Sequence, residues 1–458
     1  MTLSNQGVEV SSVDEVMTTS RIPVSAETAP IPISGSRGWR DVAQTMRIGN
    51  YRFVFTSMLA GSIANWMSRV AQDWMLLELT GNVALVGLAV TFQFTPVLLF
   101  GLWGGVLSDR FPRLRIVLIS HSVTTASLVA LSVLTLTGSI QIWQIYLAAS
   151  LTGFAAVAES PARTALVTQI VPPSRIQTAI SINAMTFHGS GLIGPALSGA
   201  VIAAFGAGWS LLSALCLSVV SLTSLACIRR SALHPVTPSD RTSGVRDAIR
   251  YAKRKPTIRW PLVILAFLAT FGMTHTVLYA AAASGVGYDT GAAGYGFYMA
   301  LGALGAVTGA ILSTRRSTVG LRSVVFAATS FGVFMLVAAG APWQGLFLAA
   351  IVALSTCRIL FGTAAESLLQ ISSNPSIRGR VAALYFVIMT GGQTGGAVLI
   401  GWIAQTYGIH IAYAVAGGIP LLASCGVGIA IARERQLRVR VRLRNPRRLV
   451  RIEPVLDA

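Results

Sequence analysis

Twelve long apolar runs constrain the fold of this chain more than any other feature. A helix needs about 20 apolar residues to cross the hydrocarbon core of a bilayer. The runs cover residues 52–79, 83–107, 115–137, 141–163, 178–204, 207–228, 258–283, 292–313, 320–339, 344–368, 379–404 and 409–432. Only 11% of the residues are charged, against about 25% in soluble domains, and the mean hydropathy is +0.67. These values exclude a disordered chain, a collagen-like chain and an ordinary cytosolic enzyme, and predict an all-α membrane protein.

Lysine and arginine residues gather in alternate gaps between these runs. The gaps without either residue type are 80–82, 138–140, 205–206, 284–291, 340–343 and 405–408. Of the 35 Lys and Arg residues, all except Arg69 and Arg358 lie in the other gaps, at a run's end or in the tails. Cytoplasmic loops carry such an excess of positive charge. We therefore expect twelve spans, both termini in the cytoplasm, and a place in a bacterial inner membrane.

The two halves of the chain share a pattern. Four residues of the fifth run and the glycine that follows it recur in and after the eleventh run at a constant offset of 202, as Gly189/Gly391, Gly194/Gly396, Leu197/Leu399, Gly199/Gly401 and Gly206/Gly408. Two parallel six-helix halves are the layout of one large transporter fold. The expected units are a mostly disordered tail (1–51), a first half (52–228), a cytoplasmic linker (229–257), a second half (258–432) and an Arg-rich tail (433–458). The last tail has no aromatic residue to stack on bases, so we expect it to bind anionic lipid and not nucleic acid.

The gap after the second run carries a motif. It reads Gly105-Val-Leu-Ser-Asp109-Arg110-Phe-Pro-Arg113-Leu-Arg115. This loop resembles the signature loop of the major facilitator superfamily, Gly-x-x-x-Asp-Arg-x-Gly-Arg-Arg, with departures at Pro112 and Leu114. The resemblance implies a latch that stabilises the outward-open state. The alternative is a topology loop with a chance Asp-Arg pair.

Three further charged residues lie near the cytoplasmic ends of the fourth and tenth runs. Glu159 and Arg163 are one helical turn apart, and Glu366 holds the matching place in the second half. We interpret them as structural partners of the latch in preference to groups that transfer protons.

The fifth run contains a second motif, with Gly191, Gly194, Pro195 and Gly199. It resembles the motif of drug–proton antiporters in the same superfamily, which ends Gly-Pro-x-x-Gly-Gly, although Ser198 replaces one glycine. The proline bends the helix, and the glycines permit tight contact with a helix of the other half. Packing alone would also select small residues here.

The first run is unusually polar. Asn65, Arg69, Gln72 and Asp73 are three or four residues apart and share one helix face. A charge at the bilayer centre costs about 3 kcal/mol or more, so this face should look into protein or a water-filled cavity. Arg358 in the tenth run is the other cation within a run. We expect Asp73 to be the proton-linked carboxylate, with Arg69 close enough to set its pKa, so that proton and substrate compete. A purely structural Arg69–Asp73 pair is the alternative.

Other reactive side chains give weaker signals. The single histidines His188 and His275 are interpreted as packing or hydrogen-bonding residues. Cys216, Cys227, Cys357 and Cys425 lie in apolar runs, and we expect free, buried thiols. The sequence has no phosphate-binding loop, dinucleotide fingerprint, metal-ligand cluster or nucleophile elbow, so no cofactor and no enzymatic activity are expected.

The resemblance to the major facilitator superfamily extends over residues 40–432. Within it, Arg69, Gln72, the Leu79-Thr80-Gly81 turn and the 159–163 segment are similar to the enterobactin exporter and related proton-driven effluxers. This similarity implies a monomeric secondary transporter that exports small molecules such as drugs or siderophores in exchange for protons, by rocker-switch alternating access. The alternatives are a proton-coupled importer on the same fold and a non-transporting membrane sensor.

Overall fold

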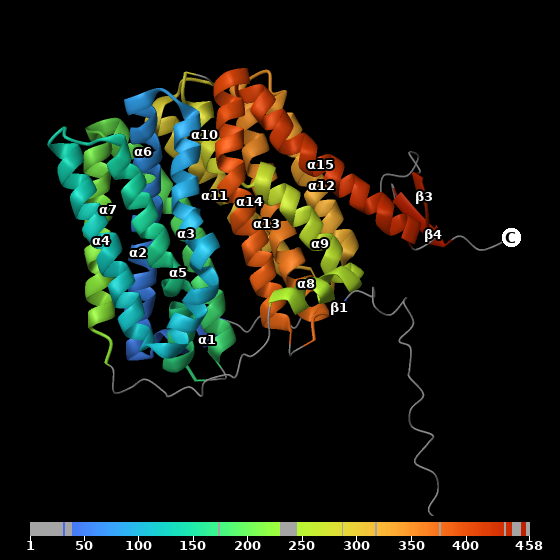
Figure 1. Cartoon of the computed structure of the whole chain (residues 1–458), viewed down its shortest axis with the longest axis horizontal. Helices are drawn as coiled ribbons and strands as arrows, with labels where there is room; N and C mark the ends of the chain where they lie inside the picture. The colour runs from blue at the N-terminus through green and yellow to red at the C-terminus, as the bar shows by residue number, and fades with distance from the viewer. Residues whose placement is uncertain are drawn as a thin grey trace, which may run out of the picture.

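The computed structural model describes residues 31–32, 39–172, 175–229, 245–285, 287–316, 318–374, 377–434, 437–441 and 450–454, and it is almost wholly helical (Figure 1). In the first part of the chain the helices are α1 (Trp39–Met46), α2 (Gly49–Thr80), α3 (Val83–Arg110), α4 (Arg113–Leu136), α5 (Ile142–Ile170), α6 (Ile176–Phe205) and α7 (Ala207–Ala226). In the second part they are α8 (Val245–Arg254), α9 (Pro256–Phe267), the π-helix η5 (Leu268–Gly272), α10 (His275–Ala283), α11 (Gly291–Thr314), α12 (Leu321–Ala339), α13 (Gln344–Ser372), α14 (Arg378–Tyr407) and α15 (Ile409–Glu434).

Ten helical stretches in the described part of the chain are long and apolar enough to cross a membrane. They are α3, α4, α6, α7, the α9–η5–α10 stretch and α11 to α15. The sequence predicts twelve spans, and the two remaining long helices are α2, with 32 residues, and α5, with 29 residues. Their ionised side chains lower their hydropathy, and both pack among the other helices.

The helices form two groups, which Figure 1 shows in blue to green and in yellow to red. In the first group α2 packs on α6 and α7, α4 packs on α5 and α7, and α3 packs on α5. In the second group the α9–η5–α10 stretch packs on α14 and α15, α12 packs on α13 and α15, and α11 packs on α13. Between the groups, α3 packs on α14 and α6 packs on α11. Each helix–helix contact in the first group thus has a counterpart in the second group. The helices that make it hold the same places in the order along the chain.

Two glycines end equivalent helices in the same conformation. Gly206 follows α6 with φ 90° and ψ 169°, and Gly408 follows α14 with φ 87° and ψ 167°. A side chain is strained at such positive φ values, so glycine is required at both turns. These residues are the last pair of the 202-residue repeat, which therefore extends to the backbone conformation.

The seventh apolar run, 258–283, is not one continuous helix. The π-helix η5 lies between α9 and α10, and Met273 N–H bonds to Leu268 O at 2.8 Å, five residues back. Residues 273–274 then separate η5 from α10. Apolar periodicity does not reveal such a break, because every residue around it suits a membrane helix. π-Helical turns are rare and occur often at functional sites.

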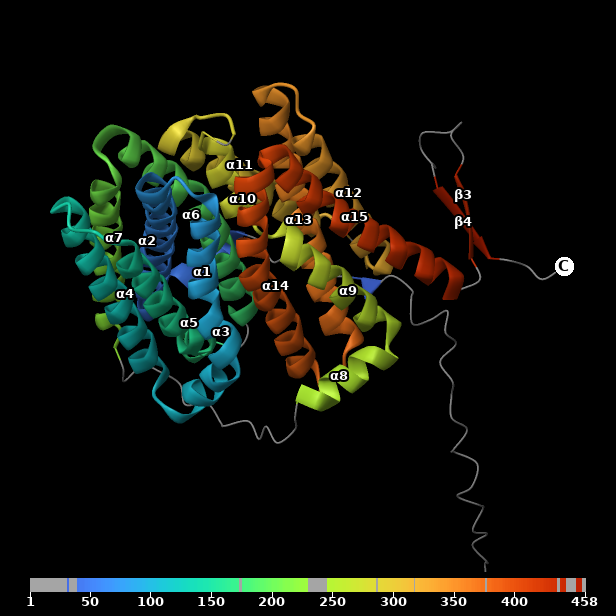
Figure 2. The same cartoon turned by 45° about the horizontal axis from the view of Figure 1, so that its top comes forward.

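The connections of the bundle fall at two ends. We call the end at connections 81–82, 137–141, 206, 340–343 and 408 the arginine-free end, and the opposite end the arginine-rich end. The helix α8 lies at the arginine-rich end, beside the start of α14 (Figure 2). Two short antiparallel pairs complete the described chain, β1 (Ile31–Pro32) with β2 (Thr318–Val319) and β3 (Leu437–Val441) with β4 (Val450–Pro454).

The four cysteines are free, but only one of them is buried. Cys357 is buried, whereas Cys216, Cys227 and Cys425 are exposed on the helix surfaces. The expectation of buried thiols is wrong for these three residues. An apolar position on a membrane helix can face lipid as well as protein, and the sequence does not distinguish the two.

Candidate functional site

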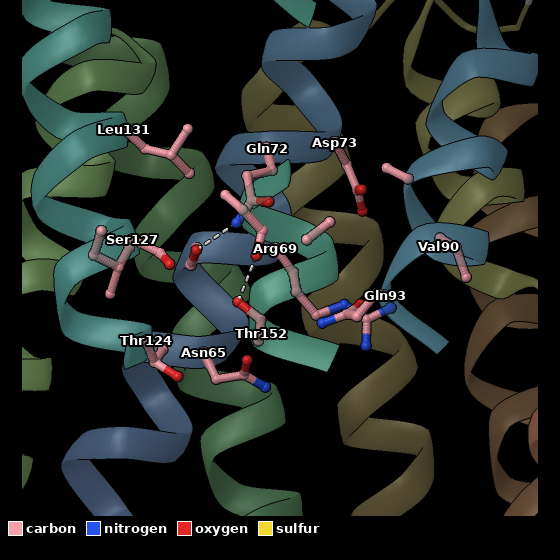
Figure 3. A pocket seen from close by; sticks show the side chains of 15 residues that line it. Asn65, Arg69, Gln72, Asp73, Val90, Gln93, Thr124, Ser127, Leu131 and Thr152 are labelled. Atoms are coloured by element: carbon pink, nitrogen blue, oxygen red, sulfur yellow. Dashed lines mark hydrogen bonds between the residues drawn. The ribbon is translucent and has the colours of Figure 1, made fainter. Parts of the chain in front are cut away.

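A small cavity lies within the first group between α2, α3, α4 and α5 (Figure 3). The four polar residues predicted to share one face of α2 all line it: Asn65, Arg69, Gln72 and Asp73. The other walls add the polar side chains of Gln93, Thr124, Ser127 and Thr152. The polar face of α2 thus faces the protein interior. Exposing these polar and charged side chains to lipid would cost free energy.

Asp73 is the buried carboxylate of this cavity, with 5% of its surface exposed. The hydroxyl of Tyr295 on α11 donates a hydrogen bond to Asp73 Oδ2 at 2.8 Å. The Tyr295 ring also stacks on Trp74, with 6.4 Å between ring centroids. Asp73 therefore connects the two groups of helices. The sequence did not reveal this partner, which lies 222 residues away in an apolar run.

Arg69 has aromatic neighbours instead of a direct ion pair. Its guanidinium lies 5.5 Å from the ring centroid of Trp66 and 5.6 Å from that of Phe94. Aromatic faces attract cations, and this stabilises the charge where water is scarce. Among the residues that the structure describes, Arg69 and Asp73 form no direct ion pair, but the two groups interact electrostatically. The proton-linked carboxylate and the structural Arg69–Asp73 pair both stay predictions. Figure 3 shows both side chains at the cavity.

Arg358 lies outside this cavity, on α13 of the second group. Its Nε is buried and has no hydrogen-bond partner, and the same holds for Nδ1 of His275, the first residue of α10. His275 interacts electrostatically with both Arg358 and Arg69. The break before α10 makes this histidine the first residue of the helix. His275 packs edge-on against Tyr279, with 5.8 Å between the ring centroids, while the His188 side chain lies outside the described residues.

Contacts between the two groups gather nearer the arginine-free end. Three side-chain hydrogen bonds between described residues join the groups: Tyr295 to Asp73 at 2.8 Å, Thr91 Oγ1 to Thr394 O at 2.6 Å, and Val83 N to Gln405 Oε1 at 2.9 Å. Gly87 also lies against the backbone of Ala397, with no room for a side chain. The groups are therefore closed on each other at this end.

The glycines of the fifth-run motif divide between two neighbours. A Cβ added at Gly194 would lie 2.7 Å from the Cβ of Trp66, and one at Gly191 would lie 3.4 Å from the Trp66 ring. These two glycines therefore pack on α2 of their own group. A Cβ at Gly199 would lie 2.7 Å from the Cα of Gly296 on α11, so Gly199 is the motif glycine that contacts the other group.

The repeat reproduces this division in α14. Gly396, the counterpart of Gly194, has no room for a side chain against Thr270 of η5, in its own group. A Cβ at Gly401, the counterpart of Gly199, would lie 3.0 Å from Val83 O on α3 of the other group. Pro195 lies inside α6, as expected, and its carbonyl oxygen also faces α11. The small residues thus set the approach of helices within and between the groups.

The signature loop joins α3 to α4 at the arginine-rich end. Arg110, the last residue of α3, is exposed, and Nη1 of Arg113, the first residue of α4, is buried without a hydrogen-bond partner. The Gly105 and Asp109 side chains lie outside the described residues. The latch therefore stays a prediction.

Glu159 is held by an ion-pair network on α5. Its Oε1 lies 3.3 Å from Arg163 Nη1 and 3.6 Å from Nε2 of His121 on α4. His121 Nδ1 in turn lies 3.0 Å from Ser221 Oγ on α7. Its counterpart Glu366 is exposed on α13 and accepts a hydrogen bond from Gln370 at 3.2 Å. The two halves therefore differ at this position, and the sequence missed His121 because its partner is on another helix.

Glu159→Gln is expected to destabilise the protein by roughly 1–3 kcal/mol, because it leaves the half-buried Arg163 without a counter-charge. The midpoint of thermal unfolding in detergent should fall by about 2–5 °C. Glu366→Gln is the matched control and should leave the midpoint unchanged. Equal effects of the two substitutions would show that the network on α5 does not stabilise the fold.

Comparison with known proteins adds the family. A family model described as transmembrane secretion effector matches residues 42–446. The chain belongs to this family of the major facilitator superfamily. It is 25% identical to the MFS-type transporter YfiS of Bacillus subtilis over 395 residues, 80% of this chain and 89% of that protein. It is 26% identical to the enterobactin exporter EntS of Salmonella choleraesuis over 362 residues, 77% of this chain and 84% of that protein.

Solved structures agree on the fold. A bacterial homologue of the human lysosomal transporter Spinster, in an inward-facing and unoccupied conformation, aligns with a TM-score of 0.62 and 16% identity, covering 84% of this chain and 96% of that chain. This chain is thus a multi-pass membrane transporter of the major facilitator superfamily and not an enzyme.

Proposed function

We propose that the protein is a proton-coupled exporter of small molecules, an antiporter that works as a monomer by rocker-switch alternating access. Twelve membrane helices in two six-helix halves, 52–228 and 258–432, would pivot about a central cavity. The observation that carries the proposal is the position of Asp73. Its buried carboxylate lines a cavity and accepts a hydrogen bond from Tyr295, and this bond connects the two groups of helices. The similarity to an enterobactin exporter supports export, with siderophores or drugs as substrates.

The proposed topology follows from the charges. The arginine-rich end faces the cytoplasm of a bacterium and the arginine-free end faces outward, with both termini inside. The contacts that join the two groups lie nearer the outer end. The structure then corresponds to an inward-facing state, in which the cavity is reached from the cytoplasm.

Proton coupling follows from what protonation does to the Tyr295–Asp73 bond. An ionised carboxylate accepts a stronger hydrogen bond than a neutral one, so ionised Asp73 stabilises closure of the outer end. A proton that arrives from outside, when the outer end is open, neutralises Asp73. In the inward-facing state the proton leaves to the cytoplasm, and the bond to Tyr295 forms again. Substrate in the same cavity competes with the proton, which makes the exchange obligatory.

Transport into liposomes tests this function. Liposomes that hold the protein with its arginine-rich face outward and contain an acidic lumen should accumulate labelled enterobactin or a labelled drug. Accumulation should stop when a protonophore dissipates the gradient. A proton-coupled importer would accumulate substrate only with an alkaline lumen, and a non-transporting sensor would accumulate none in either case. Either of these two results would refute the proposed export.

A further inference from the structure

Trp74 is a second residue of α2 that contacts Tyr295. It follows Asp73 in the chain and is buried, with 8% of its surface exposed. Its ring stacks on the Tyr295 ring of α11, with 6.4 Å between the centroids and 26° between the ring planes. Stacked aromatic rings attract each other beyond the effect of the area they bury. The first group therefore holds Tyr295 at two points, the hydroxyl at Asp73 and the ring at Trp74.

A hydrogen bond within α2 fixes the orientation of the Trp74 indole. Its Nε1–H donates to Glu78 Oε1 at 2.5 Å, four residues further along the helix. Glu78 is exposed near the end of α2 that leads into the arginine-free connection 81–82. Because donor and acceptor belong to one helix, this bond does not depend on the position of the second group. The indole is thus a fixed surface of α2 on which the Tyr295 ring packs.

The backbone of α11 is held on another side. Gly296, next to Tyr295, packs on α6, where a Cβ added at Gly296 would lie 2.6 Å from the Cα of Gly199. This contact sets the approach of the backbone and leaves the tyrosine side chain free to rotate about its own bonds. The stack on Trp74 is therefore the contact that orients the Tyr295 ring and aims its hydroxyl at Asp73.

Few charged groups face Asp73. Arg69 on α2 interacts with it electrostatically, and His275 on α10 interacts in turn with Arg69. The polar side chains that line the cavity from α3, α4 and α5 are neutral: Gln93, Thr124, Ser127 and Thr152. Among the residues that the structure describes, Tyr295 is the hydrogen-bond donor to the Asp73 carboxylate. The orientation of one ring therefore decides whether the ionised carboxylate has its donor.

We propose that Trp74 is a positioning residue for proton coupling, because its indole holds the Tyr295 ring with the hydroxyl on ionised Asp73 while the outer end is closed. This inference rests on the proposed function. When α2 and α11 separate, Tyr295 loses the stack and the acceptor together, and Asp73 is left without its donor and takes up a proton. Trp74 thus makes the hydrogen bond depend on the position of the two groups and not on free rotation of the tyrosine.

Infrared titration of the purified, detergent-solubilised protein tests the inference. The carbonyl band of protonated Asp73 is identified by its absence in Asp73→Asn. Trp74→Leu should move the midpoint of this band upward by roughly 0.5–1 pH unit, because the ionised carboxylate loses its oriented donor. Trp74→Phe keeps a ring that can stack and should move the midpoint less. Trp209→Leu removes an exposed tryptophan from α7 and is the matched control, with no expected shift.

A double variant distinguishes positioning from a general structural role. Tyr295→Phe removes the hydroxyl itself, so adding Trp74→Leu to it should cause no further shift. A merely structural Trp74 would lower the thermal unfolding midpoint and leave the titration where it is. An unchanged midpoint in folded Trp74→Leu, or additive shifts in the double variant, would overturn the inference. If Trp74→Leu does not fold, Trp74→Met replaces the ring with a longer flexible chain and gives the same test.

This titration separates the inference from the proposed function. A shifted titration in a protein without gradient-driven transport would refute the antiport and leave the positioning role intact. Proton-driven export together with an unshifted titration in Trp74→Leu would refute the positioning role and leave the antiport intact.

Discussion

Asp73→Asn should abolish proton-driven export while the protein still folds and inserts. Asparagine has nearly the same shape, and its amide oxygen can accept the hydrogen bond that Tyr295 donates to Asp73 at 2.8 Å. It cannot gain or lose a proton, so the gradient no longer drives the cycle. Export into acidic-lumen liposomes should fall to the level of empty liposomes. Exchange of substrate in the absence of a gradient should continue.

The control for this substitution is on the same helix. Glu78 lies near the end of α2, and its carboxylate accepts a hydrogen bond from Trp74. Glu78→Gln removes the same charge from α2 and should leave proton-driven export intact. Full export by Asp73→Asn would reject Asp73 as the proton-linked group, and equal losses in both variants would indicate a general effect of the charge on α2.

Cross-linking the outer end should stop transport completely and reversibly. Thr91 Oγ1 on α3 donates to Thr394 O on α14 at 2.6 Å, so a cysteine pair at these two positions lies at the contact that must separate. A rocker-switch transporter must separate α3 and α14 here in order to open outward. In a background with the four native cysteines replaced, oxidation of Thr91→Cys/Thr394→Cys should reduce transport to background, and a reductant should restore it.

Single-cysteine variants under the same oxidant provide the comparison, and they should transport normally. Substrate binding from the arginine-rich side should persist in the cross-linked protein, because the lock keeps the inward-facing state. Normal transport by a quantitatively cross-linked double variant would show that the outer end does not have to open between α3 and α14.

Much of the framework could be predicted from local features. The polar face of α2 is an example, because residues three or four apart share a helix face regardless of the fold, and Asn65, Arg69, Gln72 and Asp73 do line one cavity. The offset between the fifth and eleventh runs likewise anticipated glycines with equivalent contacts in α6 and α14. In both cases the spacing along a helix contains the information.

Partners on other helices could not be predicted in the same way. Tyr295 and His121 contact the carboxylates Asp73 and Glu159, yet nothing in their own runs pairs either residue with a carboxylate on another helix. The break that makes His275 the start of a helix is also hidden, because η5 is as apolar as α9. Each of these features depends on how helices distant in sequence approach one another.

The sequence by itself determined a helical membrane protein, the positions of its long helices and the polarity of its connections. Lipid imposes these properties on each segment separately, since every backbone group must be bonded within its own helix and positive charge stays on one side. Only the tertiary structure decided which polar groups meet and which end of the bundle is closed. Lipid is as apolar as the helix surfaces, so helices associate through the close fit of small residues such as Gly199 and Gly296, and that fit exists only between helices already in place.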